Sequence, residues 1–537
     1  MAKLKKLITY RNATIIVFGI LFLIVLATFP DYGISWDERW HLNYGYTLIN
    51  YYRSLLHGQI DAEATTYRDL FVYGGVFDLT ANIGIKLLGV ILPFGKMELR
   101  HLVTALTGLL GIGGTWAVGR KLGGERAGFW AVVFLATTPA YYGHIFFNPK
   151  DIPFAAGYIW SLYFLLILLQ DQGGYRWLKL SGFALVTGLT MGVRVGGIFL
   201  LFYFGLVLLW NYWRHPVLKS GSKLVDFSKR VLLPAFVVGL FSYLVMLIFW
   251  PWAQQNPVLN PLIALREISQ FGFPHPVLFN GQFIMATELP WNYLITYFVV
   301  SLPEILLLLC LVGGIWAFVR LLRTLRSHQF PSYRFMGGVV LLLAVIIPII
   351  TAILARSTLY DGLRHFIFVI PPLVCLVAIT FSVALDWLAK INRKLDIVIT
   401  GLVSLYLIVQ IVVMIQLHPY EYIYYNQLVG GVPGAYRRFE TDYWGTAESE
   451  AAKWLVKYLQ KEWQSEQQVT YVFIGCADEF SAYYYFPPQV QWTLDESLAD
   501  YYILSTRWFC SDQVTGEEIY RVSRQGVPIS VIKKVVH

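Results

Sequence analysis

The stretch RNATIIVFGILFLIVLATFPDYGISWDERW, residues 11–40, decides the fold class. An apolar run from Thr14 to Phe29 follows a start with four basic and no acidic residues, and its length suits a helix that crosses a bilayer. A signal peptide would begin in the same way. However, Pro30-Asp31-Tyr32 follows the run, where a signal peptide would have a small-residue cleavage site. We therefore predict a first transmembrane helix that enters from the cytoplasm.

The rest of the chain has the same character. Of 537 residues, 57% are hydrophobic and 14% are charged, whereas soluble domains carry roughly 25% charged residues. Together with the first span, the apolar runs predict a polytopic α-helical membrane protein with about eleven transmembrane helices. The further spans are expected near 101–118, 128–144, 153–170, 180–193, 195–211, 231–250, 293–319, 336–355, 365–384 and 397–417.

The charges between the spans predict the orientation. The segments expected inside hold 21 Lys and Arg but 5 Asp and Glu: 1–12, 119–126, 171–180, 212–230, 320–334 and 386–396. The first outer loop, 31–100, has eight acidic and six basic residues. This asymmetry predicts that the N-terminus lies in the cytoplasm and the C-terminal domain on the outer side. The predicted location of the protein is the cytoplasmic (inner) membrane. The asymmetry also accounts for the net charge of +9 without nucleic acid.

The count depends on one short pair of runs, 180–193 and 195–211. If they form a single span, every later loop changes sides and the basic loop 320–334 lies outside. The charge rule speaks against that arrangement.

Two regions outside the spans have structure of their own. In the first outer loop, 42–56 and 81–92 suggest helices along the membrane interface, although a soluble helical hairpin remains an alternative. Residues 418–537 predict a small extracytoplasmic α/β domain after a transmembrane domain over 1–417. Its expected elements are a helix over 446–463, strands over 469–474 and 501–504, and a hairpin over 519–522 and 529–535.

The four cysteines divide between the two regions. Cys310 and Cys375 fall within predicted spans, where they suit apolar packing. Cys476 and Cys510 lie in the outer domain, in a compartment that allows a disulfide. Their spacing does not show whether they come within bonding distance.

Charged residues gather on the predicted outer side, in five separate loops. The candidates are Asp37 and Glu38; His144, Lys150 and Asp151; Arg194; Glu288; and Asp361, Arg364 and His365. Helix N-termini, lipid headgroup contacts and an aromatic belt are the plainer explanations. The spans show no comparable charges at mid-membrane depth and no convincing repeat, which favours an enzyme at the outer interface over a carrier.

These segments also resemble a known family. The matching motifs are WDE at 36–38, HIFFNPKDIPF at 144–154, GVRVGG at 192–197, LPWNY at 289–293, DGLRHFIFVIPP at 361–372, HPYEYIYYNQLVGG at 418–431 and DYWG at 442–445. In this order they resemble the membrane glycosyltransferases of the C superfold (GT-C), specifically the bacterial and archaeal members of glycosyltransferase family 39. Protein O-mannosyltransferases and the lipid A aminoarabinose transferase are relatives.

The resemblance implies a reaction and a set of roles. Such enzymes move a sugar from a polyprenyl-phosphate carrier to an acceptor on the outer face, usually with inversion. Asp37 would be the base, Glu38 would orient the acceptor or Asp37, and Asp151 would hold the acceptor. Arg364 and His365 would neutralise the departing phosphate, with Lys150 and Arg194 as weaker candidates. His144, Glu288 and Asp361 are possible contacts of the acceptor or the donor.

Several points stay open at this stage. Asp37, Glu38 and Asp151 could bind Mg²⁺ or Mn²⁺, but a monophosphate leaving group does not require a metal. The acceptor could be a glycan, a lipid or a protein, since the chain shows no sign of the β-trefoil domain of the eukaryotic mannosyltransferases. No feature singles out aminoarabinose or lipid A. A transporter or flippase for lipid-linked sugars is the alternative function, and a mere membrane anchor would need only one span.

Overall fold

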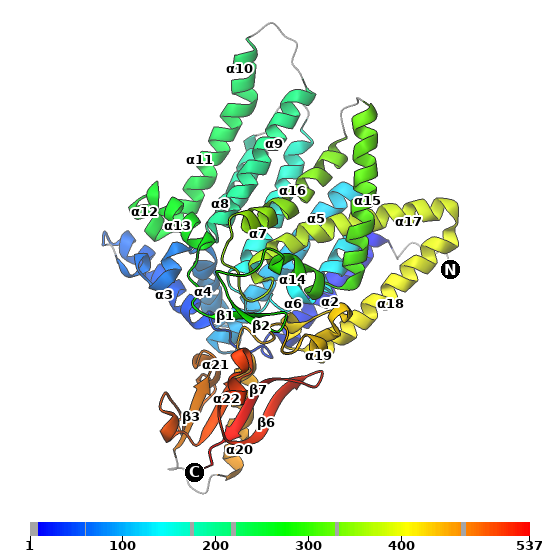
Figure 1. Cartoon of the computed structure of the whole chain (residues 1–537). Helices are drawn as coiled ribbons and strands as arrows, with labels where there is room; N and C mark the ends of the chain where they lie inside the picture. Colours follow the sequence, from blue (N-terminus) through cyan, green and yellow to red (C-terminus); the bar gives the residue numbers. More distant parts are fainter. Residues whose placement is uncertain are drawn as a thin grey trace.

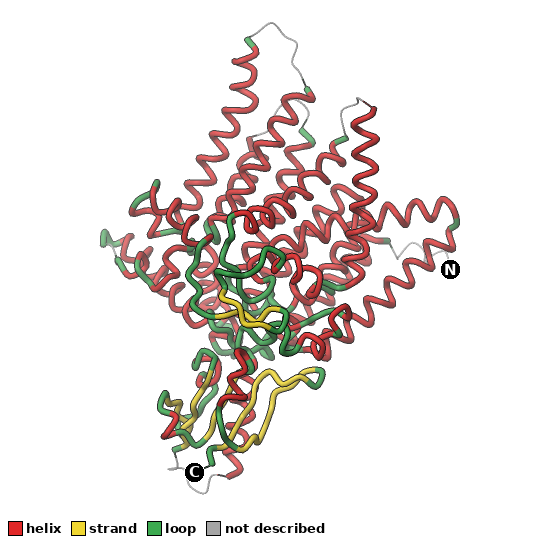
Figure 2. The backbone as a smooth tube through the Cα atoms, viewed as in Figure 1, coloured by secondary structure: helices red, strands yellow, loops and turns green. Residues whose placement is uncertain are grey.

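The structure is a computed structural model that describes residues 9–59, 61–171, 177–215, 222–327, 332–462 and 469–536. A large helical part and a small sheet domain at one end of it make up the molecule (Figures 1 and 2). Lys3, Lys5 and Lys6, on which part of the predicted orientation rests, lie outside the described residues. In Figure 1, α10 lies at the end of the helical part opposite the sheet domain.

The helical part confirms a multi-pass membrane protein. Within the described ranges, nine helices are long and apolar enough to cross a membrane. The apolar elements are α2 (Tyr10–Thr28), α5 (Lys96–Ala136), α7 (Asp151–Leu169), α8 (Trp177–Met191), α9 (Ile198–Arg214), α10 (Lys223–Phe227) with α11 (Leu233–Ile248), α15 (Glu304–Ser327), α16 (Tyr333–Leu354), α17 (Ile370–Ile391) and α18 (Arg393–Leu417).

Two of these helices explain the difference between the nine candidate helices and the eleven spans predicted from the sequence. Helix α5 includes Gly124 at φ 84°, which breaks the helical path between two arms near the predicted spans 101–118 and 128–144. Helix α8 has 15 residues, about 22 Å of helix, which is short for a hydrocarbon core of roughly 30 Å. The count of eleven therefore stays a prediction.

The predicted span 293–319 is wrong in its bounds. The structure divides it into α14 (Tyr293–Ser301) and α15, with Leu302 in an extended conformation between them. Pro303 follows Leu302, and the residue before a proline is pushed out of the helical region. The apolar helix that could cross a membrane therefore begins at Glu304.

The centre of the helical part consists of α5, α7 and α17, which pack on one another. Gly108 of α5 permits close packing, because a Cβ there would lie 2.6 Å from the side chain of Ile145. Helices α2, α15 and α18 lie outside this centre and expose large apolar side chains, including Ile15, Leu311 and Leu402. Such faces suit contact with lipid.

Further elements, most of them short, join the helices on the side of the sheet domain. They are α3 (Glu38–Leu56), α4 (Val76–Leu88), α6 (Pro139–Tyr142), α12 (Pro251–Gln255), α13 (Leu259–Ser269), β1 (Pro276–Phe279) paired antiparallel with β2 (Gln282–Met285), and α19 (Gly431–Ala435). The first two are the helices expected in the first outer loop, although α4 begins and ends earlier than the predicted 81–92.

The sheet domain confirms the predicted α/β arrangement and adds a strand. Its five strands lie in the order β4-β3-β5-β7-β6, and α20 (Ala447–Glu462) packs against β5, β6 and β7. The strands are β3 (Thr470–Gly475), β4 (Val490–Thr493), β5 (Tyr501–Ser505), β6 (Glu517–Arg524) and β7 (Val527–Lys534), with short helices α21 (Phe480–Tyr483) and α22 (Cys510–Gln513). Strand β4 was not predicted from the sequence. Cys476 and Cys510 form a disulfide, with Cα atoms 6.2 Å apart.

Residues 418–446 connect the two parts and pack on the helical one. Asn426 donates from its side-chain amide to the carbonyls of Val299 and Leu302. The hydroxyl of Tyr443 contacts Nε2 of His144 at 3.1 Å. This segment therefore fixes the sheet domain against one end of the helical part.

Candidate active site

Six of the predicted site residues line one cavity of about 260 Å³ between the helical part and the loops that join its helices. They are Asp37, Lys150, Asp151, Arg194, Arg364 and His365. They come from four separate places in the sequence: the start of α3, the start of α7, the turn after α8, and the 3-10 helix Arg364–Val369 before α17. The fold thus brings these four segments together at one cavity.

Asp37 and Asp151 line the cavity and form ion pairs, and the side chain of Asp37 is the more exposed of the two. Asp37 precedes the first residue of α3, but its side chain makes no capping hydrogen bond. The side chain is 44% exposed, and its Oδ2 lies 3.7 Å from Nη1 of Arg364. Helix capping therefore does not account for this carboxylate, which is free to contact a ligand.

Glu38 does not line the cavity. It is fully buried, its Oε2 accepts a hydrogen bond from the backbone N–H of Ser35 at 2.8 Å, and its Oε1 lies 3.1 Å from Nε2 of His101 on α5. Glu38 thus fixes the turn that presents Asp37, and contact with an acceptor is not what the structure indicates for it.

Asp151 is held on both of its oxygens. Asn148 donates to Oδ2 at 2.8 Å, and Nη2 of Arg194 lies 2.7 Å from Oδ1. The amide oxygen of Asn148 also accepts from the backbone N–H of Asp151. This arrangement anchors Arg194 at the cavity wall and leaves Asp151 partly neutralised.

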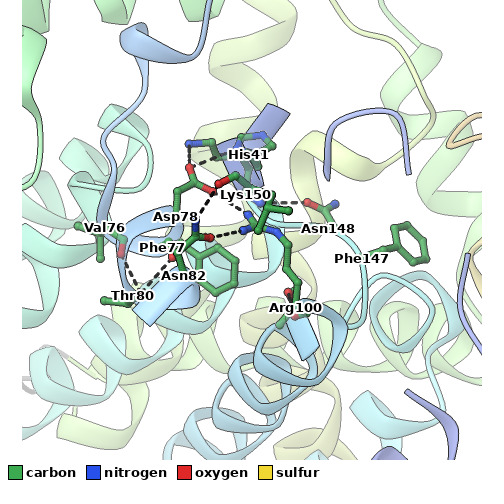
Figure 3. Close-up of polar contacts among 12 residues, drawn as sticks. His41, Val76, Phe77, Asp78, Thr80, Asn82, Arg100, Phe147, Asn148 and Lys150 are labelled. Atoms are coloured by element: carbon green, nitrogen blue, oxygen red, sulfur yellow. Dashed lines mark hydrogen bonds and ion pairs between the residues drawn. The ribbon is translucent and has the colours of Figure 1, made fainter. Parts of the chain in front are cut away.

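Lys150 belongs to a buried ion cluster that the sequence does not predict (Figure 3). Its Nζ lies 3.2 Å from Oδ2 of Asp78 on α4. The same carboxylate pairs with Nη2 of Arg100 at 2.8 Å and with Nδ1 of His41 at 3.2 Å. Figure 3 shows the three nitrogen-bearing side chains converging on Asp78 from different segments.

The cluster keeps a positive charge next to the cavity. Burial alone raises the pKa of Asp78, but Lys150, His41 and Arg100 together hold that pKa well below its usual range. Burial also lowers the pKa of Lys150, and Asp78 offsets part of this effect. Asp78 carries one negative charge, whereas Lys150 and Arg100 carry two positive charges between them. The cluster therefore supplies net positive charge to the cavity wall.

Arg364 is placed by its neighbours in the chain. Asp361 at φ 56° and Gly362 at φ 64° form a left-handed turn that brings Oδ2 of Asp361 within 3.0 Å of Nη1 of Arg364. The guanidinium carbon lies 4.7 Å from the ring of Tyr360 and 4.5 Å from that of Trp444. These contacts hold a planar cation at the cavity, as a phosphate-binding arginine requires.

Three other candidates do not reach the cavity lining. Asp361 lies behind Arg364, as described. His144 is buried, with Nδ1 2.9 Å from the carbonyl of Ala140, and burial lowers its pKa to about 3. Glu288 is exposed on the turn after β2. The structure gives His144 a packing role between α6 and Tyr443 and places Glu288 at the surface.

The three carboxylates considered as metal ligands do not converge. Glu38 faces His101, and Asp151 faces Arg194 and Asn148, so neither of them joins Asp37 in a set of ligands. Over the described residues, no group of three or more His, Cys, Asp or Glu side chains is arranged to hold a metal ion. The side chains therefore do not fit the metal site considered for them.

The cavity combines charge with aromatic surface. Four basic side chains line it, Arg68, Lys150, Arg194 and Arg364, against three acidic ones, Asp37, Asp69 and Asp151. Its aromatic lining consists of Trp40, Tyr73, Phe271, Tyr360 and Trp444. A ligand that joins an anionic group to a ring suits such a lining.

One family model matches part of the chain. Residues 85–250 match the family described as dolichyl-phosphate-mannose-protein mannosyltransferase. This range includes Lys150, Asp151 and Arg194 and excludes Asp37 and Arg364. The match confirms the resemblance to membrane glycosyltransferases over these residues and supports glycosyl transfer in general. No curated protein sequence matches the chain.

Solved structures of two proteins are similar in fold to most of this chain. ArnT from Cupriavidus metallidurans bound to undecaprenyl phosphate has a TM-score of 0.49 at 15% identity, covering 97% of each chain. Its apo form has a TM-score of 0.48 at 15% identity, covering 97% of this chain and 96% of that one. The oligosaccharyltransferase of Archaeoglobus fulgidus in its apo form has a TM-score of 0.49 at 14% identity, covering 91% of this chain and 65% of that one. No donor, acceptor or catalytic residue follows from likenesses this distant.

Proposed function

We propose that the protein transfers a sugar from a polyprenyl-phosphate carrier to an acceptor hydroxyl at the outer face of the cytoplasmic membrane. The observation that carries the proposal is the half-exposed carboxylate of Asp37 beside the guanidinium of Arg364, 3.7 Å apart in one cavity. A base for the acceptor and a cation for the leaving phosphate are the two groups that such a displacement needs. The family described for residues 85–250 uses a donor of this class by its name.

The reaction assigns each group a step. Asp37 accepts the proton of the acceptor hydroxyl, whose oxygen attacks the anomeric carbon of the sugar. The bond between that carbon and the phosphate oxygen breaks, and its electron pair leaves with the polyprenyl phosphate. Arg364 and His365 face the developing charge, while Arg194 and Lys150 add positive potential at the cavity wall. Attack opposite the leaving group inverts the anomeric centre.

The roles of the remaining acids follow from their contacts. Asp151 holds Arg194, and Glu38 holds the turn of Asp37. We include no metal in the proposal, because Asp37, Glu38 and Asp151 do not form a ligand set. The sugar and the acceptor class stay open: a hexose is the first donor to test, and glycans, lipids and proteins are the acceptors.

A transfer assay tests the proposal. Purified protein in detergent is given radiolabelled polyprenyl-phosphate hexose and a membrane extract as the acceptor source. We expect a labelled product with a new glycosidic bond. Asp37→Asn should lower the rate by about 10²–10⁴-fold, the usual contribution of a general base, whereas Glu63→Gln, an exposed acid of the same loop, should not.

Two results would contradict the proposal. Full transfer by Asp37→Asn would remove the assigned base. Movement of label that requires sealed vesicles and forms no product bond would instead favour the transporter or flippase, since a carrier needs two compartments.

A further inference from the structure

Arg507 of the sheet domain is part of the ion-pair chain that reaches the cavity, although it does not line the cavity itself. Its Nη2 lies 2.5 Å from Oδ1 of Asp361 and 3.5 Å from Oε1 of Glu440. Its Nη1 donates to the carbonyl of Tyr443 at 2.9 Å. The other oxygen of Asp361 contacts Arg364. One carboxylate thus joins an arginine of the sheet domain to the cavity arginine.

The charges of these ion pairs determine how much of the positive potential of Arg364 remains available to a ligand. Asp361 carries one negative charge and shares it between two guanidinium groups. Without Arg507, that charge would act on Arg364 alone and cancel most of its field at the cavity. Arg507, Asp361 and Glu440 have side chains 6%, 4% and 3% exposed, so water screens these interactions little.

The loop that carries Arg507 is shaped to present it. Trp508 and Phe509 follow at φ 53° and 57°, a conformation that bulky residues keep only when their surroundings fix it. Nε1 of Trp508 donates to the carbonyl of Pro276 at 2.8 Å. The next residue, Cys510, is bonded to Cys476 at the end of β3. The loop is therefore fastened on both the helical part and the sheet.

We propose that Arg507 is a positioning residue, which offsets the charge of Asp361 so that the positive potential of Arg364 stays available to the phosphate of the lipid carrier. The inference rests on the proposed function, because the carrier phosphate is the group that Arg364 would bind. It makes the sheet domain a contributor to the active site, so that the cavity reaches its full affinity for phosphate only with this domain in place.

The test measures binding of undecaprenyl phosphate to the full-length protein in detergent, together with the kcat and KM of transfer. Arg507→Met removes the charge and keeps most of the volume. We expect the Kd to rise about tenfold, a common size for coupling within one ion-pair network, and kcat to fall. Arg437→Met is the matched control: Arg437 pairs with Asp512 of the sheet domain, but both side chains are about half exposed. That variant should bind as the wild type does.

A second variant distinguishes the charge route from a loss of structure. Adding Asp361→Asn to Arg507→Met removes the carboxylate that would otherwise cancel Arg364. The double variant should therefore bind undecaprenyl phosphate more tightly than Arg507→Met alone. Glu440 would be left without its cation, but burial already raises its pKa to about 7, so it can take up a proton. Binding that is not improved by Asp361→Asn would overturn the inference.

The remaining outcomes are equally decisive. An unchanged Kd in folded Arg507→Met overturns the inference and leaves the proposed function intact. If thermal unfolding shows that Arg507→Met is not folded, Arg507→Gln replaces it, because glutamine removes the charge and can still donate a hydrogen bond to Asp361 or to the Tyr443 carbonyl. A raised Kd supports the inference, and a wild-type Kd overturns it. A wild-type protein that neither binds undecaprenyl phosphate nor transfers sugar overturns the proposed function itself.

Discussion

Two adjacent carboxylates, Asp37 and Glu38, are suited to different functions because their surroundings differ. Asp37 keeps an open side chain at the cavity with a cation 3.7 Å away. Glu38, one residue on, is turned into the protein and holds Ser35 and His101. The backbone of a helix start points successive side chains about 100° apart, so one faces the ligand space and the other faces α5. Only the first is suited to proton transfer.

Replacing Glu38 should therefore affect folding more than chemistry. Glu38→Gln leaves a buried amide N–H₂ against a backbone N–H or the ring of His101. We expect the free energy of unfolding to fall by about 1–3 kcal/mol, the cost of an unsatisfied buried polar group. Thermal unfolding in detergent measures the change.

The matched comparison is Asp37→Asn, whose half-exposed side chain should leave stability nearly unchanged. An equally stable Glu38→Gln with a transfer rate as low as that of Asp37→Asn would assign Glu38 to the chemistry instead.

Single residues could be predicted where a charge interrupts apolar sequence. Asp37, Asp151, Arg194 and Arg364 stand out for that reason, and the structure brings them to one cavity. Asp78 did not stand out, because a polar position in an amphipathic helix is ordinary. Its importance arises from Lys150, 72 residues away, and no local pattern reports a contact of that kind.

At the scale of elements, the cavity depends on one close backbone contact. Gly74, before α4, lies against Gly192, which follows α8, so that a Cβ at Gly74 would be 2.1 Å from the carbonyl oxygen of Gly192. The same oxygen accepts from the backbone N–H of Val76 at 3.2 Å. This contact sets the distance between the segment of Tyr73 and the turn of Arg194, both of which line the cavity.

Gly74→Ala should push these two segments apart, since backbone atoms cannot rotate away as a side chain can. We expect a loss of stability of about 1–3 kcal/mol, as for overpacked cores, together with weaker binding of undecaprenyl phosphate. Thermal unfolding and a binding titration measure the two effects. Gly272→Ala, in the loop before β1 where a Cβ would meet nothing within 4 Å, is the control. Equal behaviour of both variants would show that the contact is not important.

Elements with a strong period were predictable, and those set by one residue or by pairing were not. The helix near 446–463 and the hairpin near 519–535 carry their pattern in their own residues, and both are confirmed. Strand β4 has four residues at the sheet edge and gains its identity from pairing with β3. The division of 293–319 depends on Pro303 alone, which the hydropathy of its apolar neighbours concealed.

At the scale of the whole molecule, His418 joins three distant parts of the chain. Its Nε2 lies 3.1 Å from Asp31, just after α2, and its Nδ1 lies 2.9 Å from Glu421, just after α18. Its carbonyl accepts from Nε of Arg524 in the hairpin of the sheet domain. The ends of the first and last apolar helices and the sheet domain therefore meet at one titratable ring.

This junction predicts a pH dependence with a definite sign. Burial lowers the pKa of His418, but Glu421 and Asp31 outweigh burial and raise it above its ordinary value of 6.5. A folded-state pKa above the unfolded one means that the charged ring stabilises the fold. That contribution is complete below about pH 6.5 and is lost as the pH rises through the folded-state pKa. Burial lowers the pKa values of His41 and His144. These two rings therefore change the stability at acidic pH instead.

The difference in melting temperature between the wild type and His418→Gln isolates this effect, because all other titrating groups are shared. We expect the wild type to be the more stable at pH 6, and its advantage to shrink steadily toward pH 9. Glutamine can still donate one hydrogen bond to Glu421 or Asp31, so the part that disappears with rising pH is the ionic part. A difference that stays constant over this range would mean that His418 joins the three segments as a neutral ring, through hydrogen bonds and its edge-on contact with Tyr32 alone.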